Sequence, residues 1–309
     1  MLPRIADSLS FLYLDKVRVV QDDTGVCAQI QADKNRTDTV YIPTAALTCL
    51  LLGPGVSITT RALSTLARHG TSVVCTGAGG VRAYAGILPD SLTTHWLEQQ
   101  VTAWSDPQQR LATATRMYEM RFGDGSVPDG TTLAQLRGME GQRMKALYKL
   151  LAQQHGIGRF RRNYHPDQWH QQDPVNLALS AANTSLYGII HAAVLAIGCS
   201  PALGFVHTGK QHAFVYDIAD LYKAEATLPV AFSLHQSANP EQEARGKFRE
   251  ELRLIRLLPR IIRDIQTLLT PDADTDDDHP ERHDVHLVHL WDPKTGVLPA
   301  GVNYAPDGG

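Results

Sequence analysis

The hydrophobic pattern of the chain changes once, near residue 90, and this change divides the predicted fold. Before it, short runs rich in Val, Ile, Tyr and Leu alternate with turn residues such as Asp22-Asp23-Thr24-Gly25 and Gly53-Pro54-Gly55. Such runs are typical of short β-strands, and one helix is expected at residues 59–68. The predicted strands span residues 11–20, 26–32, 39–42, 47–52, 72–75 and 81–85.

After residue 90 the apolar residues recur at helical spacing. Asp173 precedes Pro174 and Asn239 precedes Pro240, and both pairs are typical of a helix start. We therefore predict an α+β fold: a β-rich N-terminal domain (1–90), a larger all-α domain (91–270) and a flexible acidic C-terminal tail (271–309). The predicted helices span residues 92–122, 131–155, 174–197, 216–234 and 240–269, the last with a kink caused by Pro259.

Composition limits the class of protein. With 43% hydrophobic and 20% charged residues in 309, the chain has enough apolar surface for a real core. The four cysteines lack CxxC spacing, which argues against a disulfide scaffold and a zinc ribbon. The most apolar stretch, 188–198, contains His191 and is too short to span a bilayer. We expect a soluble cytoplasmic protein without a membrane partner.

The net charge of −3 conceals an asymmetry along the chain. Residues 271–309 contain nine acidic and two basic residues, a net charge of −7, and the remaining body carries +4. A basic body with an acidic tail leaves room for a nucleic-acid partner, against which the overall charge alone would argue.

One candidate for chemistry is Glu140, which falls in line with an apolar stripe on its predicted helix. Burying an unpaired carboxylate is costly, so this side chain needs a metal ion, an arginine or a hydrogen-bond network. The alternative is a structural role, in which Glu140 complements the helix dipole or pairs with Arg137 or Arg143. The stripe consists of Leu136, Met144, Leu147 and Leu151.

A second candidate segment places His207 between two glycines, with Asp217 and Asp220 three residues apart on the following helix. Side chains at this spacing share a helix face. Imidazole together with carboxylates suits Mn²⁺ or Mg²⁺ with open coordination positions. The alternative is an ordinary loop histidine and two acids that complement the helix dipole.

Two basic features suit a phosphate backbone. Residues 159–169 interleave arginines with aromatic side chains, a combination that offers phosphate contacts and stacking surfaces. The last long helix carries a stripe of arginines opposite an apolar stripe. These arginines could bind the phosphate backbone of a duplex, and the alternative is an ordinary solvated helix face. The arginine stripe consists of Arg245, Arg249, Arg253, Arg256, Arg260 and Arg263.

Three stretches together resemble the CRISPR-associated integrase of spacer acquisition, the first universal adaptation protein, in its type I-E form. They are LRGMEGQR around Glu140, GFVHTGK around His207 and FVYDIADLYK around Asp217 and Asp220. The stretches RRNYHPDQW, NLALSAANTSLYG and GAGGVRAYA support the likeness, which spans roughly residues 8–270.

The resemblance implies a set of site residues. Glu140, His207 and Asp220 match the family's ligands of Mg²⁺ or Mn²⁺, and Asp217 matches a further acidic position of that site. Ser57 and Ser64 stand where relatives often carry arginine, which puts DNA contacts from that region in doubt. Positions near the DNA strand end are matched by Tyr164, Tyr187, Lys210, Tyr216 and Lys223, and a DNA-contacting position of the sheet domain by Arg82.

The resemblance also implies an activity and partners. The expected function is that of a metal-dependent DNA integrase and endonuclease, which joins the 3′-OH of a captured duplex to a phosphodiester of the CRISPR repeat, with Lys210 stabilising an oxygen of the reacting phosphate. Dimerisation through residues 1–90 and a complex with the small second adaptation protein are expected. The tail itself predicts an acidic linker at residues 272–280 and an apolar, strand-forming segment at 284–291, which we expect to dock on that protein through Trp291. The alternative is that this segment folds back onto the helical domain. The alternatives are a non-catalytic DNA-binding scaffold with a structural ion, and a phosphohydrolase of small molecules.

Overall fold

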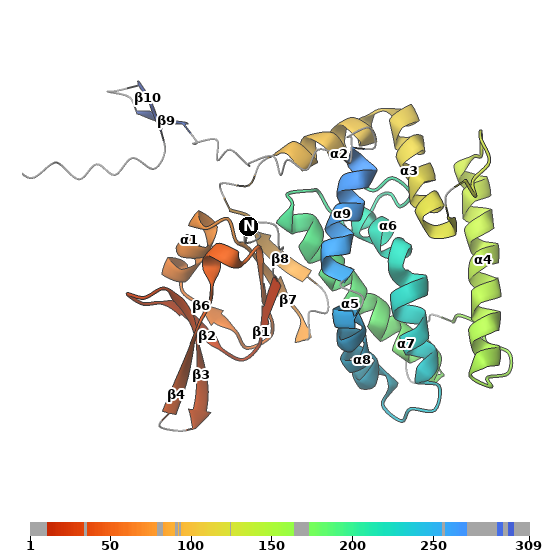
Figure 1. Cartoon of the computed structure of the whole chain (residues 1–309), viewed down its shortest axis with the longest axis horizontal. Coiled ribbons are helices and arrows are strands. Elements are labelled where there is room, and N and C mark those ends of the chain that lie inside the picture. Colours follow the sequence, from red (N-terminus) through yellow and green to blue (C-terminus); the bar gives the residue numbers. More distant parts are fainter. Residues whose placement is uncertain are drawn as a thin grey trace, which may run out of the picture.

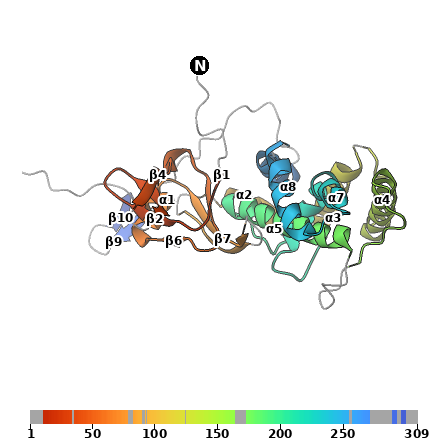
Figure 2. The same cartoon turned by 90° about the horizontal axis from the view of Figure 1, so that it is seen from below.

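A computed structural model describes residues 11–33, 36–78, 83–89, 92, 94–123, 125–163, 173–254, 257–270, 289–292 and 296–299. Its described part begins with two β-sheets and continues into a domain of helices, which lies beside the sheets in both views (Figures 1 and 2). The predicted α+β class and the order of its two parts are therefore confirmed.

The described residues of the N-terminal domain form two four-stranded sheets, the α-helix α1 (Thr60–Arg68) and the short 3-10 helix η2 (Thr44–Ala46). In the first sheet the strand order is β1-β5-β7-β8, and only β8 runs antiparallel to its neighbour. In the second the order is β4-β3-β2-β6, antiparallel except between β2 and β6. The strands are β1 (Phe11–Leu14), β2 (Arg18–Gln21), β3 (Val26–Asp33), β4 (Arg36–Tyr41), β5 (Cys49–Leu52), β6 (Ser57–Ile58), β7 (Ser72–Thr76) and β8 (Ala83–Ile87).

The single strand predicted at residues 11–20 is wrong, because the chain turns at Lys16 and changes sheet. Lys16 has a left-handed backbone (φ 54°), and its amide donates to the carbonyl of Pro54 at 3.3 Å. The amide of Gly53 donates to the carbonyl of Leu14 at 2.7 Å. These two bonds fix the turn, so β1 and β2 pair in different sheets. A continuous run of strand-forming residues does not reveal such a turn.

The first sheet is buried on both faces at its central strands β5 and β7, as the continuously apolar sequence of β5 requires. Neighbouring side chains of a strand point to opposite faces. Leu50 packs with Leu66 of α1 on one face, whereas Leu51 packs on the other with Ala192 and Ala196 of α5 (Pro174–Ala196). Beside this contact Gly86 has no side chain, and a Cβ there would come within 2.7 Å of a methyl group of Leu195. The sheet thus anchors the central helix of the second domain.

In the helical domain α5 lies at the centre and contacts α6, α7, α8, α9 and β8. It is the one described helix that is long and apolar enough to cross a membrane, but 67% of the tested window is buried inside the fold, as in the core helix of a soluble protein. The surrounding helices are α2 (His95–Ser105), α3 (Pro107–Phe122), α4 (Leu133–Gln154), α6 (Ala213–Tyr222), α7 (Leu228–Ser233), α8 (Pro240–Leu254) and α9 (Leu257–Leu269).

Proline residues interrupt two of the predicted long helices. The helix predicted at 92–122 is two helices, because Asp106 is extended before Pro107 and caps α3 by accepting from the amides of Gln108 and Gln109. The helix predicted at 216–234 contains a π-helical segment, η5 (Lys223–Thr227), just before Pro229. Proline removes one amide donor, and the adjacent backbone bonds shift to the π pattern.

The C-terminal part contributes one described element, an antiparallel pair of β9 (His289–Asp292) and β10 (Gly296–Pro299) in which Trp291 lies opposite Val297. The strand expected near residues 284–291 thus agrees in part with β9. The acidic linker predicted at 272–280 lies outside the described residues. So do residues 255 and 256, between α8 and α9, where the kink expected from Pro259 would fall.

Candidate functional site

The segment before α6, residues 200–207, is tied to three neighbouring helices through its backbone carbonyls. Gln100 of α2 donates to the carbonyls of Ser200 and Leu203, at 2.9 and 3.2 Å. Trp104 Nε1 and Arg110 Nη2 both donate to the carbonyl of Gly204, at 3.1 and 3.0 Å. Arg137 of α4 donates to the carbonyl of Val206 at 2.9 Å. The segment that carries His207 is therefore held in place by α2, α3 and α4.

Gly204 is required by the close approach of the chain to itself. A Cβ at this position would lie 2.4 Å from the carbonyl oxygen of His207 and 2.8 Å from two atoms of Ala213. We expect Gly204→Ala to lower the free energy of unfolding by about 1–3 kcal/mol, as overpacking does, and to reduce catalysis because His207 shifts. Thermal unfolding and strand-transfer assays measure both effects.

A matched control exists in α8, where a Cβ on Gly246 would meet nothing within 4 Å. Gly246→Ala should raise the free energy of unfolding by about 0.5–1 kcal/mol, since alanine favours the helix. A Gly204→Ala protein as stable and active as wild type would contradict the tight packing around His207.

Asp217 of α6 is fully buried and organises this segment. Its Oδ2 accepts from the backbone amides of Phe205 and Val206, at 2.5 and 3.0 Å. Its Oδ1 accepts from the amide of His207 at 2.8 Å and lies 2.7 Å from His207 Nδ1. With both oxygens engaged, Asp217 acts through His207 rather than on a substrate, which makes it a positioning residue.

The contact with Asp217 sets the orientation of the His207 ring. Asp217 Oδ1 accepts the hydrogen bond that Nδ1–H donates, and in this tautomer the lone pair of the imidazole lies on Nε2. Nε2 faces Asp220, with its nitrogen 4.0 Å from Asp220 Oδ2. The His207 side chain remains 41% exposed, so this nitrogen is accessible from solvent.

Asp220 lies between cationic side chains. Its Oδ1 accepts from Lys223 Nζ at 2.5 Å, and its Oδ2 lies 3.7 Å from Arg121 Nη1. Burial raises the pKa of Asp220, but Lys223, Arg121 and His207 outweigh this effect and hold the pKa below its usual value. Burial likewise lowers the pKa of Lys223, whereas Asp220 and Tyr187 raise it above the usual range. Asp220 is therefore ionised at neutral pH.

Three of the residues predicted near a DNA strand end lie together beside His207. Tyr187 and Tyr216 are in edge-to-face contact, with ring centroids 5.1 Å apart, and Lys223 Nζ lies 5.1 Å from the Tyr187 ring. The Tyr216 ring is 5.8 Å from that of His207. Aromatic faces next to a cation form a surface on which a base and its phosphate can bind.

Glu140 occupies the inner side of α4, as its sequence position predicts. Leu136 and Leu151 are buried on the same helix, and the Glu140 side chain is 19% exposed. Its carboxylate forms two hydrogen bonds with Arg143, at 2.9 and 3.1 Å. This pair is the structural alternative that the sequence left open, and it keeps both oxygens occupied.

Tyr118, a buried tyrosine on α3, lies close enough to Asp220 and Glu140 for both carboxylates to affect its pKa. The pKa of Tyr118 is raised, mainly by burial and further by Asp220 and Glu140, while Arg121 and Arg137 lower it.

The candidate metal ligands do not form a complete site. No group of three His, Cys, Asp or Glu side chains lies close enough to share a metal ion anywhere in the described part of the chain. The structure brings His207 and Asp220 together and leaves Glu140 with Arg143.

His207 and Asp220 nevertheless fit one hard divalent ion. Ligands at about 2.1 Å from such an ion lie about 3 Å apart when adjacent and about 4.2 Å apart when opposite. The 4.0 Å between His207 Nε2 and Asp220 Oδ2 falls within this span. Imidazole nitrogen with carboxylate oxygen also suits Mn²⁺ and Mg²⁺. Glu140 could complete the set only after separating from Arg143.

The remaining predicted site residues have different positions. Lys210 is exposed on the loop before α6, and Arg245 is exposed on α8. Arg260, a member of the arginine stripe, forms an ion pair with Glu225 at 2.8 Å, which the sequence did not predict. Arg82, Tyr164 and Arg256 lie outside the described residues, as do the side chains of Arg249 and Arg253.

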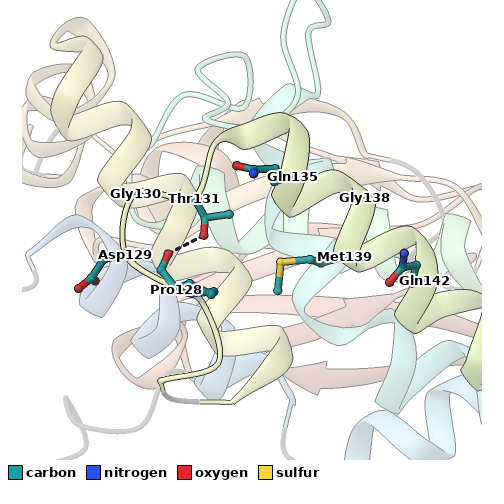
Figure 3. Close-up of a pocket in the computed structure, with 8 residues that line it drawn as sticks. All are labelled: Pro128, Asp129, Gly130, Thr131, Gln135, Gly138, Met139 and Gln142. Atoms are coloured by element: carbon teal, nitrogen blue, oxygen red, sulfur yellow. Dashed lines mark hydrogen bonds between the residues drawn. The ribbon is translucent and has the colours of Figure 1, made fainter.

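A separate hollow of about 500 Å³ lies between residues 128–131 and α4 (Figure 3). Asp129 is its one titratable residue, and Figure 3 shows that side chain directed away from Met139. Without a histidine or a cation in its lining, this hollow offers no acid–base or metal chemistry. The lining consists of Pro128, Asp129, Gly130, Thr131, Gln135, Gly138, Met139 and Gln142.

The sequence missed Arg121 and the contact of Arg137 with the backbone of Val206, whereas it named Arg143 as a possible partner of Glu140. Arg143 is three residues from Glu140, so helical spacing alone suggested that pair. Arg121 and Arg137 meet their partners across 99 and 69 positions of the chain. No local pattern in the sequence indicates such distant contacts.

Comparisons with known proteins agree with the resemblance. Residues 124–261 match the family model described as CRISPR associated protein Cas1. A CRISPR-associated endonuclease Cas1 from Clostridium sp. (strain SY8519) is 38% identical over 98% of both chains. A crystal structure of a TtCas1–DNA complex is 38% identical, with a TM-score of 0.74 over 87% of this chain and 99% of that chain.

A more distant structure, a casposase bound to an integration product, shares the fold. It is 14% identical and has a TM-score of 0.57 over 88% of this chain and 99% of that chain. At such low identity this likeness concerns the fold alone. The near-complete coverage at 38% identity to the Clostridium protein, however, decides the family. The chain belongs to the CRISPR-associated Cas1 family.

Proposed function

We propose that this protein is a metal-dependent DNA endonuclease and integrase that inserts short duplexes into a CRISPR array. In the integration reaction the 3′-OH of a captured duplex attacks a phosphodiester of the repeat, and a 3′-OH of the repeat leaves. The family and the endonuclease name of the Clostridium relative support a nuclease. The observation that carries the proposal is the pair of His207 Nε2 and Asp220 Oδ2, 4.0 Å apart on an accessible surface.

The metal would supply Lewis-acid chemistry. Mg²⁺ or Mn²⁺ held by His207 and Asp220, with Glu140 as the third ligand, would polarise the scissile phosphate. The protein's own residues provide the rest of the site: Asp217 fixes the His207 ring, and Lys223 keeps Asp220 ionised.

Other groups of the chain would position the DNA. Tyr187 and Tyr216 present aromatic faces next to the site, on which the base at a strand end can stack. Lys210 is exposed on the loop that follows His207, where its ammonium group can stabilise charge on the transferred phosphate. Arg82 and Tyr164 belong to the proposed DNA contacts through the family resemblance.

The partners are part of the proposal. A homodimer formed through the N-terminal domain, acting with the small second adaptation protein, is the assembly that the resemblance implies. The acidic tail would bind that protein through Trp291, and the cytoplasm would be the site of action. The family resemblance and the apolar, strand-forming end of the tail support these contacts.

A strand-transfer assay tests the function. The protein is incubated with branched DNA that mimics an integration product, in Mg²⁺, Mn²⁺ or EDTA. We expect cleavage and joining with either metal and none in EDTA, with DNA binding in all three. Binding without reaction in every condition would identify a scaffold. A protein that neither binds nor cleaves the DNA but hydrolyses small phosphate esters would be a phosphohydrolase of small molecules.

Salt dependence tests the arginine stripe. Each phosphate contact that is lost should lower the slope of log affinity against log salt by roughly one. We therefore expect Arg249→Ala combined with Arg253→Ala to weaken duplex binding and to reduce the slope by about two. Arg260→Ala is the matched control, because Glu225 already neutralises this arginine. An unchanged slope in the double variant would exclude the stripe from the DNA interface.

A further inference from the structure

Arg121 is a buried cation that the proposed mechanism does not yet use. It lies in the last turn of α3, and its side chain is only 1% exposed. The guanidinium group lies over the Tyr118 ring, 4.5 Å from the ring centroid. This stacking fixes the group inside the domain, where it cannot reach DNA.

The hydrogen-bonding of Arg121 is incomplete. Nε and Nη2 are buried and have no acceptor among the described residues. Unpaired buried donors are rare in folded proteins, and a buried charge without a partner is costly. The compensation for this buried charge must therefore come from a nearby anion.

The anion paired with this guanidinium is the carboxylate of Asp220. Arg121 Nη1 lies 3.7 Å from Asp220 Oδ2, which is too long for a hydrogen bond but close enough for strong attraction in a buried site. The other oxygen, Oδ1, is held by Lys223 at 2.5 Å. Oδ2 is also the oxygen that faces His207 Nε2.

The two oxygens of the Asp220 carboxylate thus interact with different cations. Lys223 binds Oδ1 by a hydrogen bond, while Arg121 attracts Oδ2 without occupying its lone pairs. A guanidinium at hydrogen-bond distance would compete with a metal ion for those lone pairs. At 3.7 Å it directs the oxygen and leaves the lone pairs accessible.

We propose that Arg121 is a positioning residue that directs Asp220 Oδ2 toward His207 as a metal ligand. The inference rests on the proposed function, because it assumes that His207 and Asp220 bind a divalent ion. It assigns the guanidinium an electrostatic role through Asp220, with no contact to substrate. A purely structural role would instead make the charge necessary for folding.

Metal affinity and stability, measured separately, distinguish the two roles. The variants are Arg121→Met, which removes the charge, and Arg121→Lys, which keeps it. Arg116→Met is the control, because Arg116 lies on the same helix but binds Thr113 and the carbonyl of Leu268. Mn²⁺ affinity is measured by calorimetry on the full chain without DNA, and the thermal midpoint is measured in EDTA.

We expect Arg121→Met to weaken Mn²⁺ binding about 10–100-fold, the usual effect of changing a residue behind a metal ligand. Its midpoint in EDTA should stay close to that of wild type, since Lys223 still pairs with Asp220 and two of the lost donors had no acceptor among the described residues. Arg121→Lys should regain at least part of the affinity. Arg116→Met should lower the midpoint and keep wild-type affinity.

Two results would overturn the inference in distinguishable ways. If wild type binds Mn²⁺ and Arg121→Met binds it equally well, the positioning role is wrong and the proposed function stands. If wild type binds no Mn²⁺, the metal-dependent function fails and the inference fails with it. Should Arg121→Met not fold, Arg121→Gln replaces it in the same measurement, and wild-type affinity in that variant overturns the role of the charge.

Discussion

Asp220→Asn should lower the rate of strand transfer by more than about 100-fold, because changes behind a metal ligand already cost about 10–100-fold. The amide keeps the size of the side chain and loses the charge that would bind the ion. The Asp220 side chain is 20% exposed and that of Lys223 24% exposed, so water can solvate the freed ammonium group. We therefore expect the variant to fold and to bind duplex DNA nearly as well as wild type.

Single-turnover strand transfer, duplex binding and the thermal midpoint are the measurements. Asp38→Asn is the matched control, since it removes a carboxylate that pairs with Arg36 at 2.8 Å on the sheet domain, away from the site. It should leave all three unchanged.

The other two predicted ligands extend the same test. Glu140→Ala should also abolish strand transfer, even though Glu140 is bound to Arg143 in this structure. Full activity in His207→Ala would contradict the ligand assignment outright. Activity in Glu140→Ala alone would show that the pair with Arg143 is the main role of Glu140.

The sequence predicted the parts of the site that depend on local spacing. Asp217 and Asp220 are three residues apart on one helix, and both face His207 from α6. The sequence did not distinguish their roles, because only the fold shows that Asp217 is surrounded by backbone amides. It also did not predict the distance from Glu140 to His207, which depends on how α4 packs against α3 and on one bond from Arg137.

The fold shows the same division between local and distant effects. Helices and strands were predicted where apolar spacing persisted over several turns or alternations. Their breaks were not, because each depends on one residue acting on its neighbours: Lys16 turns the chain between two sheets, Asp106 is extended before Pro107, and Pro229 follows the π segment. The burial of both faces of β5 likewise required knowing that α5 covers the sheet.

Asp217→Asn should affect both stability and catalysis, unlike Asp220→Asn. The carboxylate accepts from the amides of Phe205, Val206 and His207. An asparagine side chain offers one oxygen and one NH₂ group, so at least one buried backbone donor loses its acceptor. Leaving a buried donor unsatisfied costs about 1–3 kcal/mol. In a domain of about 150–250 residues each kcal/mol lowers the thermal midpoint by about 2–4 °C.

The catalytic effect follows from the tautomer of His207. If the NH₂ group that Asp217→Asn introduces faced Nδ1, that nitrogen would have to accept, and the ring proton would move to Nε2. Nε2 would then carry a hydrogen toward Asp220, where the proposed site needs its lone pair to bind the ion. We therefore expect strand transfer and Mn²⁺ affinity to be lost even well below the thermal midpoint, where the variant is folded.

Asp173→Ala separates this effect from simple destabilisation. Asp173 caps α5 by accepting from the amide of Asn176, and losing such a cap costs about 1 kcal/mol. That variant should unfold at lower temperature and remain fully active when folded, whereas Asp217→Asn should be inactive at every temperature. Wild-type midpoint and activity in Asp217→Asn would mean that the three amides and the His207 ring do not depend on the charge of Asp217. The organisation of the site would then have to come from the arginine and tryptophan bonds to the carbonyls of residues 204–206.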